Sequence, residues 1–212
     1  MAAAAPMVFV VDDDVSVRKS LVRLIKTAGY EAEPFTSVSD FLAHPAYDGP
    51  CCLVLDVRMP GLTGLDLQEA LSATERRLAI VFITGHSDVP VTVKAMKRGA
   101  VDVLTKPLDE GTLLGAIRQA VARTVADRRE QTRTTEIRQR IATLTPREAA
   151  VFALVVTGML NKQIGSDLGI VEKTVKVHRA RVMEKMGARS LAELVRLAGE
   201  GGVIAATPSP AR

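Results

Sequence analysis

The stretch Val8-Phe9-Val10-Val11-Asp12-Asp13 decides the fold of the first half of the chain. A short apolar run ends there in two carboxylates, and Leu53-Val54-Leu55-Asp56 repeats the arrangement. Thr84 closes a third apolar run, and Lys106 follows a fourth. Short apolar runs that alternate with segments of helical period are typical of a parallel sheet with crossover helices. In such a sheet ligands bind beyond the carboxyl ends of the strands, where these polar residues lie.

The alternation continues from Met7 to about Arg123 and predicts an α/β fold, a doubly wound sheet of five parallel strands. The expected strands are residues 8–11, 31–35, 51–55, 80–83 and 102–105. The expected helices are residues 15–28, 38–43, 64–72, 90–98 and 109–125. Gly29 is expected to end the first helix, because glycine readily adopts the conformation that terminates helices.

The second half of the chain looks entirely helical. Apolar period lapses between Arg128 and Glu136, in a charged stretch that is either an extended helix or a flexible link. Helices are then expected over residues 146–156, 161–168, 172–186 and 190–198, with Gly158, Gly169, Gly187 and Gly199 between or after them. We therefore predict four parts: residues 1–125, a linker 126–140, a small all-α domain 141–200 and a disordered tail 201–212.

Charge divides the chain in the same way. Residues 1–122 carry 12 Lys and Arg against 15 Asp and Glu, a net of −3, and residues 123–212 carry 16 against 9, a net of +7. An acidic front half suits a cation site, and a basic back half suits a polyanion such as DNA. The only cysteines, Cys51 and Cys52, are adjacent in an apolar run, so we expect buried thiols in a reducing compartment. The longest uncharged apolar run, residues 149–160, is shorter than the roughly 20 residues of a membrane span, which favours a soluble cytoplasmic protein.

The carboxylates at the strand ends suit a divalent cation. Mg²⁺ prefers hard oxygen ligands, which Asp13 and Asp56 can supply. Asp56 can then act as a carboxylate nucleophile that forms an acyl phosphate, while Lys106 and the Thr84 hydroxyl neutralise charge on the phosphoryl oxygens. A plainer alternative is that the negative charge of Asp12 or Asp13 only interacts favourably with the dipole of the helix that follows. Asp14 is expected to be the N-cap of that helix.

The same residues resemble the receiver domain of bacterial two-component response regulators. The resemblance rests on Val11-Asp12-Asp13, Leu55-Asp56-Val57-Arg58-Met59-Pro60-Gly61, Ile83-Thr84-Gly85-His86 and Lys106-Pro107, and it spans about residues 7–125. It implies a flavodoxin-like fold in which Asp56 receives a phosphoryl group from a histidine kinase. It also implies that Mg²⁺ is held by Asp13, Asp56 and the carbonyl of Arg58, and that Asp12 assists. Thr84 and Lys106 would read the phosphoryl group, and Arg58 and His86 would tune its hydrolysis.

One position departs from this resemblance. Such receivers usually carry Phe or Tyr three residues before the lysine, as a rotating switch, and this chain has Val103 there. Valine has no ring to rotate. We therefore expect either a switch that works through Thr84 and the backbone or a weakened response to phosphorylation.

A helix-turn-helix is predicted between Asn161 and Met186, where a short helix, a turn at Gly169 and a longer basic helix follow one another. Inward packing is expected for Ile164, Leu168, Val175, Val182 and Met186. The remaining faces carry Lys173, Lys176, Arg179, Arg181 and Lys185, which suit phosphates and guanine edges. The alternative is a solvated basic helix in a small bundle.

This segment resembles the LuxR-type DNA-binding domain over about residues 141–200. The matching motifs are Leu144-Thr145-Pro146-Arg147-Glu148, Asn161-Lys162-Gln163-Ile164 and Glu172-Lys173-Thr174-Val175-Lys176-Val177-His178-Arg179. The resemblance implies that Lys176 and Val177 face base edges and that Lys162, Thr174 and Arg179 contact the DNA backbone. It also implies that the last helix, with Leu191, Leu194 and Val195, helps to pair two domains. Two positions depart from the pattern: Val171 stands where Ser or Thr usually caps the recognition helix, and Ala180 is short.

Together the two resemblances indicate a response regulator of the FixJ/NarL type. We expect a DNA-binding transcription regulator that accepts a phosphoryl group on Asp56, dimerises and then binds double-stranded DNA. Its expected partners are a sensor histidine kinase, DNA, a second copy of itself and RNA polymerase, with Mg²⁺ as the cofactor and no catalysis beyond its own phosphorylation and dephosphorylation. One alternative is DNA binding that does not depend on phosphorylation, and another is a phosphatase of small phosphate esters.

Overall fold

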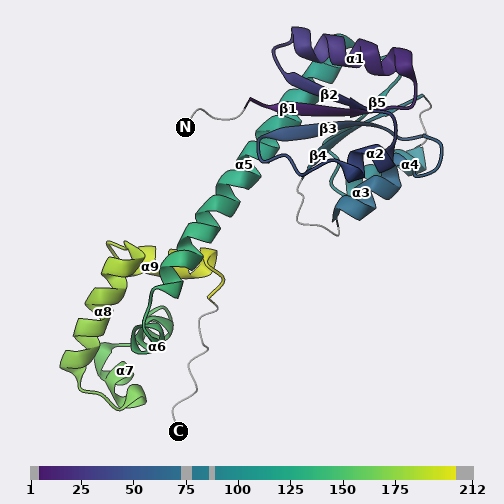
Figure 1. The fold of residues 1–212 in the computed structure, drawn as a ribbon. Helices are drawn as coiled ribbons and strands as arrows, with labels where there is room; N and C mark the ends of the chain where they lie inside the picture. The colour runs from purple at the N-terminus through teal and green to yellow at the C-terminus, as the bar shows by residue number, and fades with distance from the viewer. Residues whose placement is uncertain (1–4, 73–77, 86–88, 204–212) are drawn as a thin grey trace. The chain divides into compact units, whose positions relative to one another are not determined.

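The computed structural model describes residues 5–72, 78–85 and 89–203. The chain forms two compact units, Met1–Arg128 and Arg129–Arg212 (Figure 1). His86, assigned a tuning role by resemblance, and most of the predicted tail lie outside the described residues. Among the described residues, no helix combines the length and the apolar character that a membrane crossing requires.

The first unit contains a five-stranded sheet in which every pairing is parallel, as predicted. Its strands are β1 (Met7–Val11), β2 (Glu31–Phe35), β3 (Cys51–Asp56), β4 (Ala79–Thr84) and β5 (Asp102–Thr105), in the order β2-β1-β3-β4-β5. The order reverses between β1 and β3, which is the switch point of a doubly wound sheet. Asp56 and Thr84 are the last residues of β3 and β4, so both strands end in a polar side chain.

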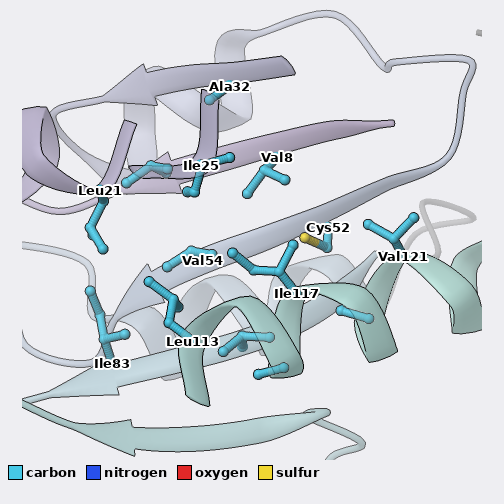
Figure 2. Close-up of a cluster of buried hydrophobic side chains, with 14 of the residues drawn as sticks. Val8, Leu21, Ile25, Ala32, Cys52, Val54, Ile83, Leu113, Ile117 and Val121 are labelled. Carbon is cyan, nitrogen blue, oxygen red and sulfur yellow. The ribbon is translucent and has the colours of Figure 1, made fainter. Parts of the chain in front are cut away.

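Helices cover both faces of this sheet, which explains the continuous apolar runs. Along β1, Val8 and Val10 face one core cluster, while Phe9 and Val11 face the other. The first cluster packs against α1 (Val15–Thr27) and the start of α5 (Glu110–Ala142) and is drawn in Figure 2. The second packs against α2 (Val38–Ala43), α3 (Gly64–Ser72) and α4 (Val89–Lys97). All six residues of both β3 and β4 are buried.

The adjacent cysteines are buried and free, as predicted. They lie at the start of β3, and their side chains enter opposite core clusters. Burial raises the pKa of the Cys51 thiol to about 11 and that of Cys52 to about 12. Both thiols are therefore protonated near neutral pH, and protonated thiols are poor nucleophiles.

The ends of α1 follow the sequence signals. The Asp14 side chain accepts hydrogen bonds from the backbone N–H groups of Ser16 and Val17, which confirms Asp14 as the N-cap. The helix ends at Thr27, one residue before the predicted end, and Gly29 follows with φ +88°. That left-handed backbone conformation favours glycine and turns the chain toward β2.

The second unit contains α6 (Pro146–Val155), α7 (Asn161–Leu168), α8 (Glu172–Met186) and α9 (Leu191–Glu200). The five residues predicted to pack inward, Ile164, Leu168, Val175, Val182 and Met186, all belong to its hydrophobic core. Gly169 and Gly187 end α7 and α8 in the left-handed conformation. Gly199 does not end α9, contrary to the prediction, because the helix continues to Glu200.

Helix α5 is much longer than predicted. It runs without interruption through residues 126–140 to Ala142, so the charged stretch is an extended helix rather than a flexible link. Apolar period lapses there because most of residues 129–142 face solvent, whereas Arg, Gln and Glu are good helix formers. Ile137 is the exception, with 3% of its side chain exposed, and it belongs to the core of the second unit.

Candidate phosphoryl-acceptor site and DNA-binding surface

The carboxyl edge of the sheet gathers the predicted acceptor residues. Asp12 directly follows β1, Asp56 ends β3, Thr84 ends β4 and Lys106 directly follows β5. Parallel strands bring their carboxyl ends to one edge, so residues far apart in sequence become neighbours. Asp12, Asp56 and Thr84 are buried, whereas Asp13 is exposed.

Three carboxylates at this edge could share a cation. Asp12, Asp13 and Asp56 each offer an oxygen, and the three oxygens lie within 4.8 Å of one another. Hard carboxylate oxygens at this spacing fit the ligand preference of Mg²⁺. Like charges so close together repel one another when no cation lies between them. The donor set therefore fits the predicted metal.

Lys106 bridges the two buried carboxylates. Its Nζ donates to Asp56 Oδ2 at 2.7 Å and to Asp12 Oδ2 at 2.9 Å. The second oxygen of each carboxylate accepts from the backbone N–H two residues later, Asp12 from Asp14 at 2.8 Å and Asp56 from Arg58 at 3.0 Å. Both carboxylates are thus held by the same pair of contacts, a lysine ammonium and a turn amide.

Burial and pairing act in opposite directions on these groups. Burial raises the pKa of Asp12 above its usual value, although the hydrogen bonds from Lys106 and the Asp14 amide lower it. For Lys106, burial by itself lowers the pKa, but the bonds to Asp56 and Asp12 leave the pKa raised. Lys106 is consequently a fixed cation near neutral pH, available to balance added negative charge at Asp56.

Two backbone contacts that the sequence does not predict support the acceptor site. An Arg18 guanidinium nitrogen donates to the Asp12 carbonyl. Gly64, at the start of α3, lies so close to β3 that a Cβ atom there would be 2.4 Å from the carbonyl oxygen of Asp56. A glycine at the first position of a helix after a strand end is a signal of close backbone approach, and it was available in the sequence.

Thr84 and Val103 lie on neighbouring strands. The carbonyl of Thr84 accepts from the Lys106 N–H at 2.8 Å, which ties the end of β4 to the residue after β5. Val103 pairs with Phe82 across the same two strands and is half-buried against the second core cluster. Arg58, the other residue of the predicted site, has an exposed side chain.

The predicted DNA-contacting residues lie on α7 and α8. Lys162, Lys176 and Val177 are exposed, and Thr174 and Arg179 are half-buried. Two of the cations already have partners within the unit. Lys176 pairs with Glu172 at 3.1 Å, and Arg179 donates to Asn161 Oδ1 at 3.1 Å. The second bond joins α8 to the first residue of α7 and holds the two helices of the motif together.

Both helices of the motif have an apolar residue at the N-cap. Val171 is the N-cap of α8 and supplies no side-chain hydrogen bond, as the sequence predicted. Leu160 precedes α7 in the same way, where the Gln163 side chain accepts from the Leu160 N–H at 2.8 Å but leucine cannot reciprocate. Both side chains are about two-thirds exposed, at 68% for Leu160 and 69% for Val171.

Two known families match most of the chain. Residues 8–118 match the response regulator receiver domain, and residues 142–198 match the bacterial regulatory proteins of the LuxR family. The chain belongs to the response regulator family, and it combines a receiver with a LuxR-type DNA-binding domain in the FixJ/NarL arrangement. This family consists of transcription regulators and not of typical enzymes, so the phosphatase alternative lacks support.

Named relatives share this organisation over almost their full length. Nodulation protein W of Bradyrhizobium diazoefficiens is 46% identical over 204 residues, which cover 96% of this chain and 90% of the relative. Transcriptional regulatory protein FixJ of Azorhizobium caulinodans is 44% identical, with 92% of this chain and 93% of the relative covered.

Solved structures agree with the fold. The response regulator StyR has a TM-score of 0.81 at 48% identity, and the match covers 93% of this chain and all of StyR. Full-length FixJ from B. japonicum has a TM-score of 0.55 at 37% identity, with 96% of this chain and all of FixJ covered. These likenesses support the flavodoxin-like receiver followed by a helical domain.

Proposed function

We propose that this chain is a phosphorylation-controlled transcription regulator whose acceptor is Asp56. A carboxylate oxygen of Asp56 attacks the phosphorus of a phosphohistidine on a sensor kinase. The new O–P bond forms as the P–N bond breaks, and the imidazole leaves with the electron pair and takes up a proton. Hydrolysis of the resulting acyl phosphate resets the protein.

The residues around Asp56 divide the work. Asp13, Asp56 and the carbonyl of Arg58 would hold Mg²⁺, with Asp12 assisting, and the ion would supply positive charge to balance the phosphoryl oxygens. Lys106 is already within hydrogen-bond distance of Asp56 and can follow the charge onto the phosphoryl group. The Thr84 hydroxyl then binds a phosphoryl oxygen, and Arg58 and His86 set the rate of hydrolysis.

The output is DNA binding by paired domains. Lys176 and Val177 face base edges in the major groove, and Lys162, Thr174 and Arg179 contact the phosphate backbone. Phosphorylation favours a homodimer, which places two recognition helices on adjacent half-sites and multiplies weak single-domain binding. A regulator of this kind works in the cytoplasm, where it contacts a kinase, double-stranded DNA and RNA polymerase.

The observation that carries the acceptor role is Lys106 bridging Asp12 and Asp56 beside the exposed Asp13. The test is phosphorylation of the full chain by a small phosphodonor, acetyl phosphate, with Mg²⁺. Intact mass should rise by one phosphoryl group, and the adduct should be labile to acid and to hydroxylamine. Asp56→Asn should abolish the adduct, because an amide oxygen is a poor nucleophile, while substitution of the exposed Asp109, directly before α5, by Asn should not. Equal labelling of Asp56→Asn would refute the assignment.

Val103 favours one alternative, in which DNA binding does not depend on phosphorylation. A half-buried valine in β5 cannot rotate an aromatic ring between two positions, so the receiver would serve for dimerisation alone. The alternatives differ in one measurement. Our proposal requires that acetyl phosphate and Mg²⁺ tighten DNA binding by the unaltered chain and leave Asp56→Asn unaffected, whereas the alternative predicts equal affinities throughout.

A further inference from the structure

The last turns of α5 belong to the core of the second unit. Ile137 is buried there, and Ile141 packs against the same cluster. Gly201, just after α9, lies against both residues: a Cβ atom on Gly201 would be 2.6 Å from Ile141 Cδ1 and 2.9 Å from Ile137 Cγ2. Arg133 adds an ion pair to Glu200 at 2.7 Å. This part of α5, residues 133–142, is called the anchor segment below.

The anchor segment also reaches the end of the recognition helix. An Arg140 guanidinium nitrogen donates to the carbonyl of Met186, the last residue of α8, at 3.1 Å. The same nitrogen lies 3.1 Å from where a Cβ on Gly187 would be, so the guanidinium packs directly over the C-cap. Carbonyls in the last turn of a helix lack intrahelical partners, and a cation there also complements the helix dipole. Arg140 satisfies both needs.

Lys185 makes further contacts from the same turn of α8. Lys185 donates to the carbonyl of Thr143 at 2.9 Å and to Glu148 Oε2 at 2.6 Å. Thr143 directly follows α5, so both contacts join the final turn of α8 to the region where α5 ends. The charged groups in these contacts are Arg140, Lys185 and Glu148, and none of them is among the proposed DNA-contacting residues.

We propose that Arg140 is a positioning residue for the recognition helix: it fixes the C-terminal end of α8 and thereby orients Lys176 and Val177 for base contact. The inference rests on the proposed DNA-binding role of α8. Val177 and Met186 are nine positions apart, about 13 Å along a helix, so a tilt of about 5° at the anchored end would move Val177 by about 1 Å. Hydrogen bonds from Lys176 and apolar contacts from Val177 to base edges both weaken with such a displacement.

The test uses the full chain and the duplex that the unaltered protein enriches from a random double-stranded library. Arg140→Met removes the donor and keeps the aliphatic length, and its binding should be roughly threefold to tenfold weaker in the folded fraction. Arg140→Lys keeps a cationic donor and should recover most of the affinity. Arg138→Met is the matched control, because it removes the same charge two residues earlier on α5. The Arg138 guanidinium donates to the Gly201 carbonyl at 3.4 Å and not to α8.

The salt dependence of binding separates positioning from direct contact. The logarithm of affinity falls linearly with the logarithm of salt concentration, and loss of one phosphate contact reduces the magnitude of this slope by about one. A positioning residue touches no phosphate, so Arg140→Met should weaken binding at an unchanged slope. A slope whose magnitude decreases by about one, or an affinity equal to that of the unaltered chain, would overturn the proposal. A chain that enriches no duplex would overturn the DNA-binding proposal itself.

A second variant perturbs the anchor segment from its other side, in case Arg140→Met does not fold. Gly201→Ala places a methyl group against Ile137 and Ile141 and should displace the segment, again weakening binding at an unchanged slope. Gly199→Ala is its control, because a Cβ on Gly199 meets nothing within 4 Å. Equal affinities of Gly201→Ala and Gly199→Ala would contradict the proposal.

Discussion

Lys106 shows why two aspartates can be buried side by side at the acceptor site. An unpaired buried carboxylate is costly, and two of them repel one another. The ammonium group bonds to one oxygen of each, and backbone amides bond to the others. Each oxygen of Asp56 therefore has a partner that also suits a phosphoryl oxygen, which prepares the site for added negative charge.

Glu148 is the residue whose protonation should matter most for the stability of the second unit. Its side chain is 3% exposed, bonds to Lys185 at 2.6 Å and completes a capping box with Thr145 at the start of α6. These hydrogen bonds, with Lys185 first, lower the pKa of Glu148 to about 2. Because the pKa is lower in the folded state than the value of 4.5 in the unfolded chain, ionised Glu148 stabilises the fold fully at pH values above 4.5. That stabilisation is lost as the pH falls from 4.5 toward 2.

We therefore expect Glu148→Gln to lower the free energy of unfolding at pH 7 and to lose this effect progressively between pH 4.5 and pH 2. Urea unfolding of the second unit, followed across that pH range, measures the difference. Glu184→Gln, on the exposed face of α8, is the control and should change little. A difference between Glu148→Gln and the unaltered chain that stays constant down to pH 2 would show that Glu148 is not held ionised in the fold.

At the scale of elements, the close approach of α3 to β3 depends on one glycine. Gly64 has no room for a Cβ atom, because the Asp56 carbonyl is backbone and Phe82 and Leu55 close the other sides at 3.0 and 3.1 Å. Gly64→Ala should therefore push the start of α3 away from the acceptor strand and cost about 1 to 3 kcal/mol of receiver stability. Phosphorylation by acetyl phosphate should also slow, because the loop that carries Arg58 begins at Asp56.

The control for this prediction lies at the same edge of the sheet. Gly85 directly follows Thr84, and a Cβ on it would meet nothing within 4 Å. Gly85→Ala should leave the unfolding midpoint of the receiver close to that of the unaltered chain. If Gly64→Ala and Gly85→Ala have the same stability and the same phosphorylation rate, the packing of α3 does not control the acceptor loop.

The recognition helix offers a second prediction at this scale. Val171 is the N-cap of α8, in an extended conformation with φ −72° and ψ 148°, and its side chain forms no capping hydrogen bond. A serine hydroxyl at that position can accept from the free N–H groups of the first turn, so Val171→Ser should stabilise the second unit by about 1 kcal/mol. Thermal unfolding measures the gain. Val177→Ser, inside the same helix and also exposed, cannot form a cap and should bring no gain.

At the scale of the molecule, the chain holds separate hydrophobic cores in its two compact units. A ligand that binds one folded unit stabilises that unit by an amount that depends on the ratio of free ligand to Kd. Mg²⁺ at about 100 times its Kd should thus stabilise the receiver by about 2.7 kcal/mol. The unfolding of the LuxR-type unit should not respond.

Calorimetry of the full chain with Mg²⁺ and then with a chelator tests this expectation. Asp13→Asn should remove most of the shift, because Asp13 is the exposed carboxylate of the three and its loss leaves the buried pair in place. Glu130→Gln, an exposed carboxylate on α5 outside the acceptor edge, should retain the full shift. A shift that survives in Asp13→Asn would place the ion elsewhere.

Much of this organisation was predictable because the relevant signals are local. Apolar runs that alternate with segments of helical period predicted the five strands. Because parallel strands have their carboxyl ends at one edge of the sheet, the sequence also predicted that Asp12, Asp56, Thr84 and Lys106 are neighbours. Caps are equally local, so Asp14 was correctly predicted as the N-cap of α1. The predicted end of α5 was wrong, because a helix whose residues mostly face solvent shows no periodic apolar pattern.

The sequence by itself thus determined the class of fold, the elements and the residue types at the acceptor edge, since each follows from patterns within a few turns of chain. Only the tertiary structure decided which groups touch. Lys106 meets Asp12 across 94 positions, Arg140 meets Met186 across 46, and Gly64 has no space beside Asp56. Such contacts arise when separate elements pack, and packing depends on the shapes of all the buried side chains together, which no local pattern encodes.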